Sequence, residues 1–154
     1  MISALELILG KTIPSVNHIG PTTFGLKREG DYVTGLSLYR CRLTDLPSSF
    51  GDLKSLQTLN LCNNQLTALP NSFGDLKSLQ TLHLEGNQLT ALPNSLGDLK
   101  SLRKLDLTQN QLTSLPESFL NLMNLQFLNV TGMSLDSQGE AIMDKLRKRG
   151  VKQN

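Results

Sequence analysis

Residues 56–78 read LQTLNLCNNQLTALPNSFGDLKS, and residues 79–101 directly after them read LQTLHLEGNQLTALPNSLGDLKS. One block of 23 residues is thus written twice with four changes. Looser copies lie at residues 33–55 and 102–124, and a partial copy spans residues 125–135. Self-similarity at a fixed period of this size is typical of solenoid proteins, whose repeats bury their apolar faces only by stacking on one another.

The copies share apolar residues at seven places, with a proline between the fifth and the sixth of them. In the last full copy these residues are Leu102, Leu105, Leu107, Leu112, Leu115, Pro116, Phe119 and Leu122. The pattern resembles the leucine-rich repeat family, in the form LxxLxLxxNxLxxLPxxFxxLxx that intracellular Ras-suppressor-like and many prokaryotic members use. The resemblance covers roughly two thirds of the chain. It implies an α/β fold, a right-handed leucine-rich repeat solenoid with a parallel concave sheet.

Each xLxLx segment is expected to form a short strand with its two leucines in the core and its other side chains outward. The polar half of each repeat has room only for a short helix or 3₁₀ turn on the convex side. In the family, an asparagine at the ninth place points inward and pairs with backbone groups at the strand ends. Here the ninth places hold Cys41, Asn64, Asn87, Asn110 and Met133. The asparagine ladder is therefore expected to stop at Asn110.

We expect one leucine-rich repeat domain over residues 1–154, with an N-terminal cap (1–32), the repeats (33–135) and a C-terminal helical cap (136–154). The N-terminal cap is predicted to contain a helix and a β-hairpin. Terminal repeats of a solenoid need a polar outer face. Caps at both ends would therefore suit a complete small protein.

In the N-terminal cap, Ser3 and Glu6 match a capping box that opens a short helix, and Gly10 is placed to end it. Residues 22–27 are predicted to form a strand that pairs antiparallel with residues 32–38. Such a strand would shield the edge of the parallel sheet from pairing with other chains.

In the C-terminal cap, Ser137 and Glu140 match a second capping box. This box predicts a helix of about ten residues to Arg149, ended by a glycine. Ile142 and Leu146 lie four residues apart on one face of this helix, which can cover the last repeat.

The chain has 15 basic and 13 acidic side chains, so no strong field selects nucleic acid or an anionic membrane. No stretch approaches the ~18 consecutive apolar residues of a membrane-spanning helix. Residues 1–10 lack the basic start and the cleavage site of a signal peptide. The two cysteines, without cysteine-rich end caps, indicate a reducing, cytoplasmic location.

The outward side chains of the strands are expected to form the concave face. The two near-identical copies differ at Asn60 against His83, Cys62 against Glu85, Asn63 against Gly86 and Phe73 against Leu96. The first three pairs lie on or beside this face. Exposed positions can simply drift, but drift alone would also have altered the convex segments. We therefore interpret the concave face as a surface diversified for recognition.

The candidate partner-binding residues are Tyr39, Arg40, Asn60, Cys62, His83, Glu85, Arg103, Lys104, Asp106 and Phe127. Tyr39 and Phe127 are the best anchor candidates, because aromatic and arginine side chains dominate binding hot spots. Either ring could instead pack against a terminal cap.

As the resemblance implies, we expect a non-catalytic protein–protein interaction module that binds a protein or peptide on the concave face. The alternative is a structural or assembly protein that self-associates through its convex side or its cap helices. We expect a monomer that can self-associate weakly, and no nucleic acid or membrane partner.

Two chemical alternatives concern Cys62, His83, Glu85 and Asp106. A Cys–His–Asp arrangement can activate a thiolate, but Cys62 and His83 fall in different rows, with Cβ atoms roughly 8 Å apart. An open sheet also offers no oxyanion hole. His83, Glu85 and Asp106 could approach a metal, but zinc needs three or four converging ligands, and solvated polar side chains explain the same residues. We expect no enzyme activity, cofactor or metal.

Overall fold

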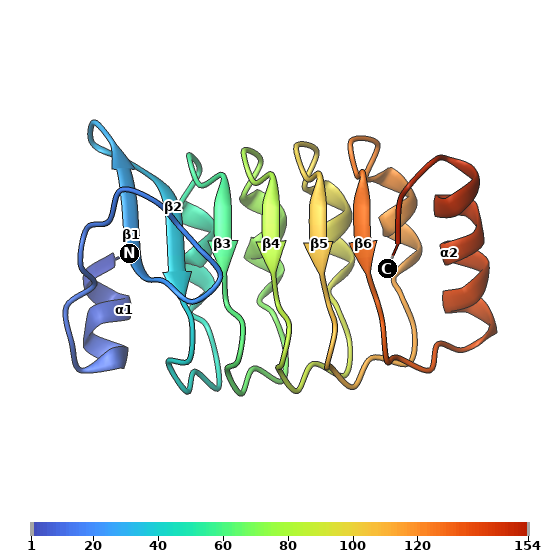
Figure 1. Cartoon of the computed structure of the whole chain (residues 1–154), viewed down its shortest axis with the longest axis horizontal. Coiled ribbons are helices and arrows are strands. Elements are labelled where there is room, and N and C mark those ends of the chain that lie inside the picture. Colours follow the sequence, from blue (N-terminus) through green and yellow to red (C-terminus); the bar gives the residue numbers. More distant parts are fainter. Residues whose placement is uncertain (1, 154) are drawn as a thin grey trace.

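The computed structural model describes residues 2–153, so Met1 and Asn154, the outermost residues of the two predicted caps, lie outside the described residues. Its central element is a six-stranded sheet whose strands follow one another in sequence order (Figure 1). The strands are β1 (Phe24–Glu29), β2 (Tyr32–Leu38), β3 (Thr58–Asn60), β4 (Thr81–His83), β5 (Lys104–Asp106) and β6 (Phe127–Asn129). β1 pairs antiparallel with β2, and each later pair is parallel.

Short 3₁₀ helices return the chain along the convex side, and an α-helix lies at each end (Figure 1). The 3₁₀ helices are η1 (Ser48–Asp52), η2 (Asn71–Asp75), η3 (Asn94–Asp98) and η4 (Glu117–Asn121). The α-helices are α1 (Ile2–Leu9) and α2 (Ser137–Lys148). The predicted α/β solenoid, with a helix and hairpin in front and a helix behind, is confirmed.

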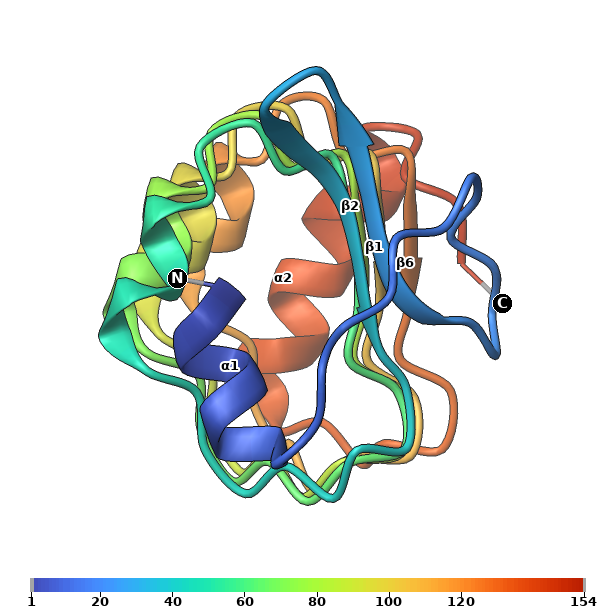
Figure 2. The same ribbon diagram turned by 90° about the vertical axis from the view of Figure 1, so that its left-hand side faces the viewer.

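The leucines of the strands form one core layer per repeat. The sheet register aligns Leu36, Leu59, Leu82, Leu105 and Leu128 in a single row. All five are fully buried between the sheet and the convex helices, which lie on opposite sides of the molecule in Figure 2. Because burying one leucine contributes about 2 kcal/mol, the stacked layers are the main apolar stabilisation of the fold.

The inward-pointing asparagines are Asn64, Asn87 and Asn110. The Asn87 side-chain amide donates to the carbonyl oxygens of Leu61 at 3.0 Å and Leu84 at 2.9 Å. Its Oδ1 accepts from the backbone N–H of Leu66 at 3.1 Å. The asparagines one repeat before and after make equivalent bonds. The ladder predicted from the family pattern is therefore confirmed, and each amide joins two successive repeats.

Glycines on the convex side let neighbouring 3₁₀ helices approach closely. A Cβ on Gly74 would lie 2.5 Å from the carbonyl oxygen of Ser95, and Gly51 and Gly97 face the same obstacle from the next repeat. The recurrence of glycine at this place therefore has a packing cause. Leu120 takes the place in the last repeat, where α2 follows instead of another 3₁₀ helix.

The start of the N-terminal cap differs from its prediction. Helix α1 begins at Ile2, and the Glu6 carboxylate accepts a hydrogen bond from the backbone N–H of Ile13 at 2.8 Å. The capping box predicted for Ser3 and Glu6 is therefore wrong. The Glu6 side chain instead fastens the segment that follows the helix.

The β-hairpin is confirmed, but β1 begins at Phe24, two residues later than predicted. On the edge of β1 that faces away from β2, the Leu26 N–H donates to the Pro14 carbonyl at 2.9 Å, and the Leu26 carbonyl accepts from the Val16 N–H at 2.8 Å. The segment before the hairpin therefore covers part of the sheet edge that β1 would otherwise expose.

Helix α2 opens one residue earlier than predicted. The Asp136 carboxylate accepts from the backbone N–H of Gly139 at 2.7 Å, so Asp136 and not Ser137 is the N-cap. Ile142 and Leu146 are buried against the last repeat, as predicted.

The C-terminal tail adds a contact to the sheet that was not predicted. Gly150, at φ 91°, turns the chain after α2 back toward β6. The Lys152 N–H then donates to the Gln126 carbonyl at 2.9 Å, and its carbonyl accepts from Leu128 at 3.0 Å. The tail thus lies beside β6 as a further parallel partner.

The substitution Asn87→Ala should destabilise the fold by about 3 kcal/mol, because it leaves buried backbone groups of two repeats without partners. Urea unfolding followed by circular dichroism measures this loss. Asn71→Ala, at an exposed convex position, is the matched control and should change stability by less than about 0.5 kcal/mol. Equal stability of the two variants would contradict the structural role of the ladder.

Candidate binding face

The register of the sheet sets side chains in rows across the concave face. One row is Gly35, Thr58, Thr81, Lys104 and Phe127, and the next is Ser37, Asn60, His83, Asp106 and Asn129. The residues of each row stand at equivalent places in successive repeats, so the predicted concave face of outward strand side chains is confirmed in its register.

Residues 18–22, here called the strap, lie over the N-terminal part of this face. Figure 2 shows the chain between α1 and β1 running along the outer side of the sheet. The Asn60 side-chain amide donates to the carbonyl oxygens of Pro21 at 2.9 Å and Gly20 at 3.3 Å. Asn60 is only 1% exposed and Cys62 only 7%. The expectation that Asn60 and Cys62 are exposed on this face is therefore wrong.

Two of the four differences between the near-identical repeats have a structural cause. Asn60 anchors the strap, whereas His83, its register partner, has no such bond to it. Asn63 and Gly86 both adopt a left-handed backbone, at φ 57° and 67°, which asparagine and glycine tolerate best. Of the positions that we interpret as diversified for recognition, only His83 and Glu85 therefore remain as candidates. Both side chains are half-buried.

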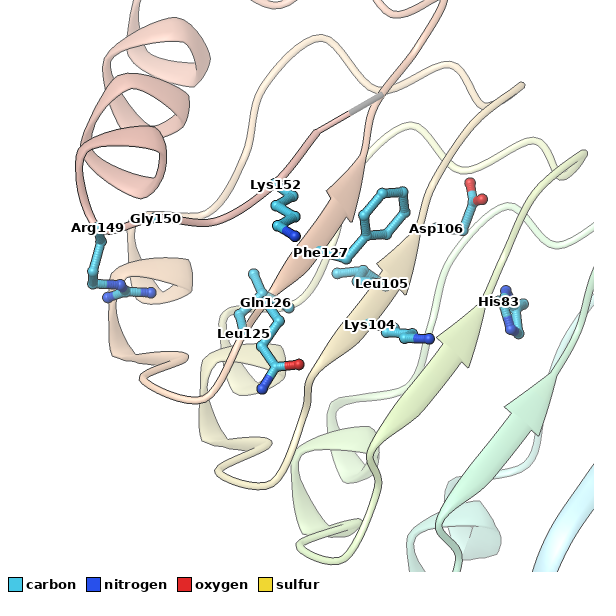
Figure 3. A pocket seen from close by; sticks show the side chains of 10 residues that line it. All are labelled: His83, Lys104, Leu105, Asp106, Leu125, Gln126, Phe127, Arg149, Gly150 and Lys152. Atoms are coloured by element: carbon cyan, nitrogen blue, oxygen red, sulfur yellow. The ribbon is translucent and has the colours of Figure 1, made fainter.

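Two hollows on the concave face share a wall. The first, of ≈ 440 Å³, lies between the strap and the strands and is lined by Tyr39, Thr58 and Glu85 among others. The second, of ≈ 630 Å³, lies toward the C-terminal end, where Lys104, Phe127 and Lys152 line it (Figure 3). His83 and Asp106 line both hollows and so mark the centre of the open surface.

His83 is the titratable group at this centre. Burial lowers the pKa of its imidazole below the usual value, while the carboxylates of Asp106 and Glu85 act in the opposite direction. The ring is therefore mainly neutral at neutral pH and offers one donor and one acceptor.

Asp106 is half-buried and has a structural task in the sheet. Its Oδ1 accepts from the backbone N–H of Thr108 at 3.0 Å and from the Thr108 hydroxyl at 2.7 Å. Its Oδ2 accepts from the Asn129 amide at 3.3 Å, across the β5–β6 pair. Replacing Asp106 would therefore disturb this part of the sheet, so it is a poor position for testing binding alone.

The other predicted contact residues differ in how close they lie to the two hollows. Tyr39 and Phe127 are half-buried and line the first and the second hollow. The Arg40 guanidinium lies 5.2 Å from the centroid of the Tyr39 ring, so the two side chains form one surface. Arg103 is exposed but lines neither hollow.

The strap and Lys152 contribute to this face but were not predicted from the repeats. Both lie outside the 23-residue pattern, so aligning repeats cannot position them. One signal in the sequence was Val151, an apolar residue directly after the glycine that ends α2, which the structure buries.

The thiols have the wrong properties for nucleophilic catalysis. Burial, with a smaller effect of the Glu85 carboxylate, raises the pKa of Cys62 to about 12. Burial also raises the pKa of Cys41. Both groups are therefore protonated at neutral pH, and a thiol is a weak nucleophile. Within residues 2–153, no three His, Cys, Asp or Glu side chains are grouped so that they could hold a metal ion.

A family model for the leucine-rich repeat region matches residues 35–148. The chain belongs to the leucine-rich repeat family. A solved leucine-rich repeat protein from Leptospira interrogans is 38% identical and superimposes with a TM-score of 0.72. The similarity covers 77% of this chain but only 30% of that protein, so this chain spans a small part of that relative's length.

No curated protein matches this leucine-rich repeat chain. Among the described residues, no helix is both long enough and apolar enough to span a membrane. The cytoplasmic location stays a prediction from the cysteine usage.

The substitution Asn60→Ala should loosen the strap and expose Cys62, because it removes both side-chain bonds to the strap carbonyls. In a Cys41→Ser background, Cys62 is the single thiol, and its alkylation by iodoacetamide at pH 8 should become at least about fivefold faster. The control is Thr58→Ala, on the same strand, whose side chain forms no hydrogen bond to the strap within residues 2–153. Unchanged alkylation of the Asn60→Ala protein would show that the strap does not depend on Asn60.

Proposed function

We propose that this leucine-rich repeat chain binds a protein or peptide on the concave face, between β4 and the C-terminal tail. Leucine-rich repeat proteins typically mediate protein–protein interactions. The observation that carries the proposal is the open ≈ 630 Å³ hollow, whose floor is the sheet itself. Because the sheet register fixes the backbone positions that carry these side chains, such a surface loses little backbone conformational entropy when a partner binds.

The composition of this hollow also suits a protein partner. Phe127 provides a half-buried aromatic surface, and His83 and Gln126 provide hydrogen-bonding groups around it (Figure 3). An apolar anchor surrounded by polar groups is the usual arrangement of a protein interface. Burial raises the pKa of both thiols, Cys41 and Cys62, and the proposed role is binding without chemistry.

The proposal predicts that peptides selected from a random phage-displayed library depend on three concave side chains. The variant His83→Ala, Glu85→Ala, Phe127→Ala should bind the selected peptides at least tenfold more weakly, since an aromatic hot spot alone is worth about 2 kcal/mol. Fluorescence polarisation measures the affinity, and circular dichroism verifies folding.

A matched variant on the convex side carries Asn71→Ala, Asn94→Ala and Lys77→Ala, all at exposed positions. It should bind like the wild type. If the convex variant loses affinity and the concave one does not, the proposed face is wrong.

Self-association through the N-terminal cap is the second candidate function. Two side chains of α1, Leu7 and Ile8, are 84% and 54% exposed. Ile8 also lines a hollow of ≈ 490 Å³ together with residues 41–47. Exposed apolar side chains beside a hollow favour a contact between copies of the chain.

This candidate predicts a mass in solution that rises with protein concentration. Sedimentation velocity of the wild type should then show dimers that disappear in the variant Leu7→Glu, Ile8→Glu. A monomeric wild type at every concentration would rule the candidate out.

A further inference from the structure

Three side chains form a row across the C-terminal end of the concave face. Lys104 on β5 is the register partner of Phe127 on β6, and Phe127 in turn bridges to Lys152 of the tail. Adjacent strands lie about 4.8 Å apart, so the two lysines start roughly 10 Å from each other with the ring between them. Figure 3 shows all three side chains at the same hollow. We call them the Lys–Phe–Lys row.

The two lysines of this row carry unneutralised charge. Both are exposed, and neither forms an ion pair with any described residue. The nearby Asp106 carboxylate already accepts three hydrogen bonds from the protein. Among these described side chains, the row therefore presents two free cations beside an apolar ring.

Arg149 lines the same hollow but is not part of this charge. Its guanidinium donates to the carbonyl oxygens of Leu120 and Leu122, both at 2.7 Å. In Figure 3 it lies beside the end of α2, on the far side of the hollow from Lys104 and Phe127. Arg149 therefore ties the end of α2 to η4, and the two lysines of the row supply the positive charge that a ligand in this hollow would meet.

We propose that the Lys–Phe–Lys row recognises an acidic peptide segment, with an apolar side chain on Phe127 and carboxylates on either side of it at Lys104 and Lys152. This inference rests on the proposed function and adds the chemical class of the partner. In an extended peptide, residues two apart lie on the same side about 6.6 Å from one another. Acidic residues two places before and after the apolar residue therefore come within reach of the flexible lysine side chains.

The neighbouring charges favour a peptide over a nucleic acid strand. Asp106 and Glu85 lie on the same concave face, one and two strands away from the aromatic ring, respectively. A continuous polyanion crossing the face would meet these carboxylates, and like charges repel. A peptide can place its acidic residues only where the lysines are. The formal net charge of the chain, +2, also provides little general attraction for phosphates.

The test uses peptides selected on the wild-type protein from a random phage-displayed library, together with an oligothymidine strand as the nucleic acid probe. The selected peptides should be enriched in Asp and Glu two residues from an aromatic or aliphatic residue. The variant Lys104→Glu, Lys152→Glu should bind them at least tenfold more weakly and should select basic peptides in their place. The oligothymidine should not compete with the peptides.

The matched control, Lys77→Glu and Lys100→Glu, reverses two exposed lysines on the convex side and should bind the acidic peptides like the wild type. Selected peptides that require Phe127 but contain no acidic enrichment would overturn this inference and leave the proposed function standing. Peptides that bind regardless of all concave substitutions, or no selected peptide at all, would overturn both. Competition by oligothymidine that the charge reversal abolishes would assign the row to a nucleic acid instead.

Discussion

The hydrogen bonds of the inward-pointing asparagines are the interaction on which the rest of this structure depends. A repeat of 23 residues must turn the chain sharply at the end of each strand, and the turn leaves buried backbone groups without partners in the sheet. The Asn87 amide satisfies groups of its own repeat and of the one before, so it also fixes how the two stack. Because burying those groups unpaired would be costly, the spacing of the strands is set from inside the core.

Because the spacing of the strands is fixed, equivalent residues of successive repeats lie side by side and form a continuous surface. Once Lys104 and Phe127 occupy equivalent places in successive repeats, the register makes them neighbours on the concave face. The two ends of the chain then decide how much of that face remains open. The strap covers the first strands through Asn60, and the tail borders the last strand through Lys152. The surface left between them extends from β4 to the tail.

The sequence could predict the structural features that recur once in each repeat, but not those that depend on segments outside the repeats. Leu59 and Leu82 recur at equal spacing, so their burial and the sheet register follow from the pattern alone. The same holds for the asparagine ladder, which has one residue per repeat. Asn60 occupies the same place as His83, so the repeat predicts the same exposure for both. Its burial comes from the strap, an irregular segment about 40 residues away whose path no periodicity describes.

The predicted capping boxes of the two α-helices were wrong for a related reason. Ser137 matched a capping pattern, but Asp136 directly before it offers a stronger acceptor, and the structure uses that carboxylate. The pattern likewise predicted that the Glu6 carboxylate accepts from a backbone N–H at the start of α1. It accepts instead from the backbone N–H of Ile13, after the helix. Short motifs of this kind state which bonds are available nearby, while the fold decides which of them form.

A partner is proposed to occupy the open surface between β4 and the tail. Amide hydrogen exchange of the wild-type chain, measured with and without the tightest selected peptide, locates the bound peptide on the fold. We expect slower exchange on binding in residues 81–87, 103–109 and 126–131 and in the tail around Lys152, with no change in η1 to η4. Protection confined to the 3₁₀ helices, or to α1 and the segment after it, would show that the peptide binds elsewhere.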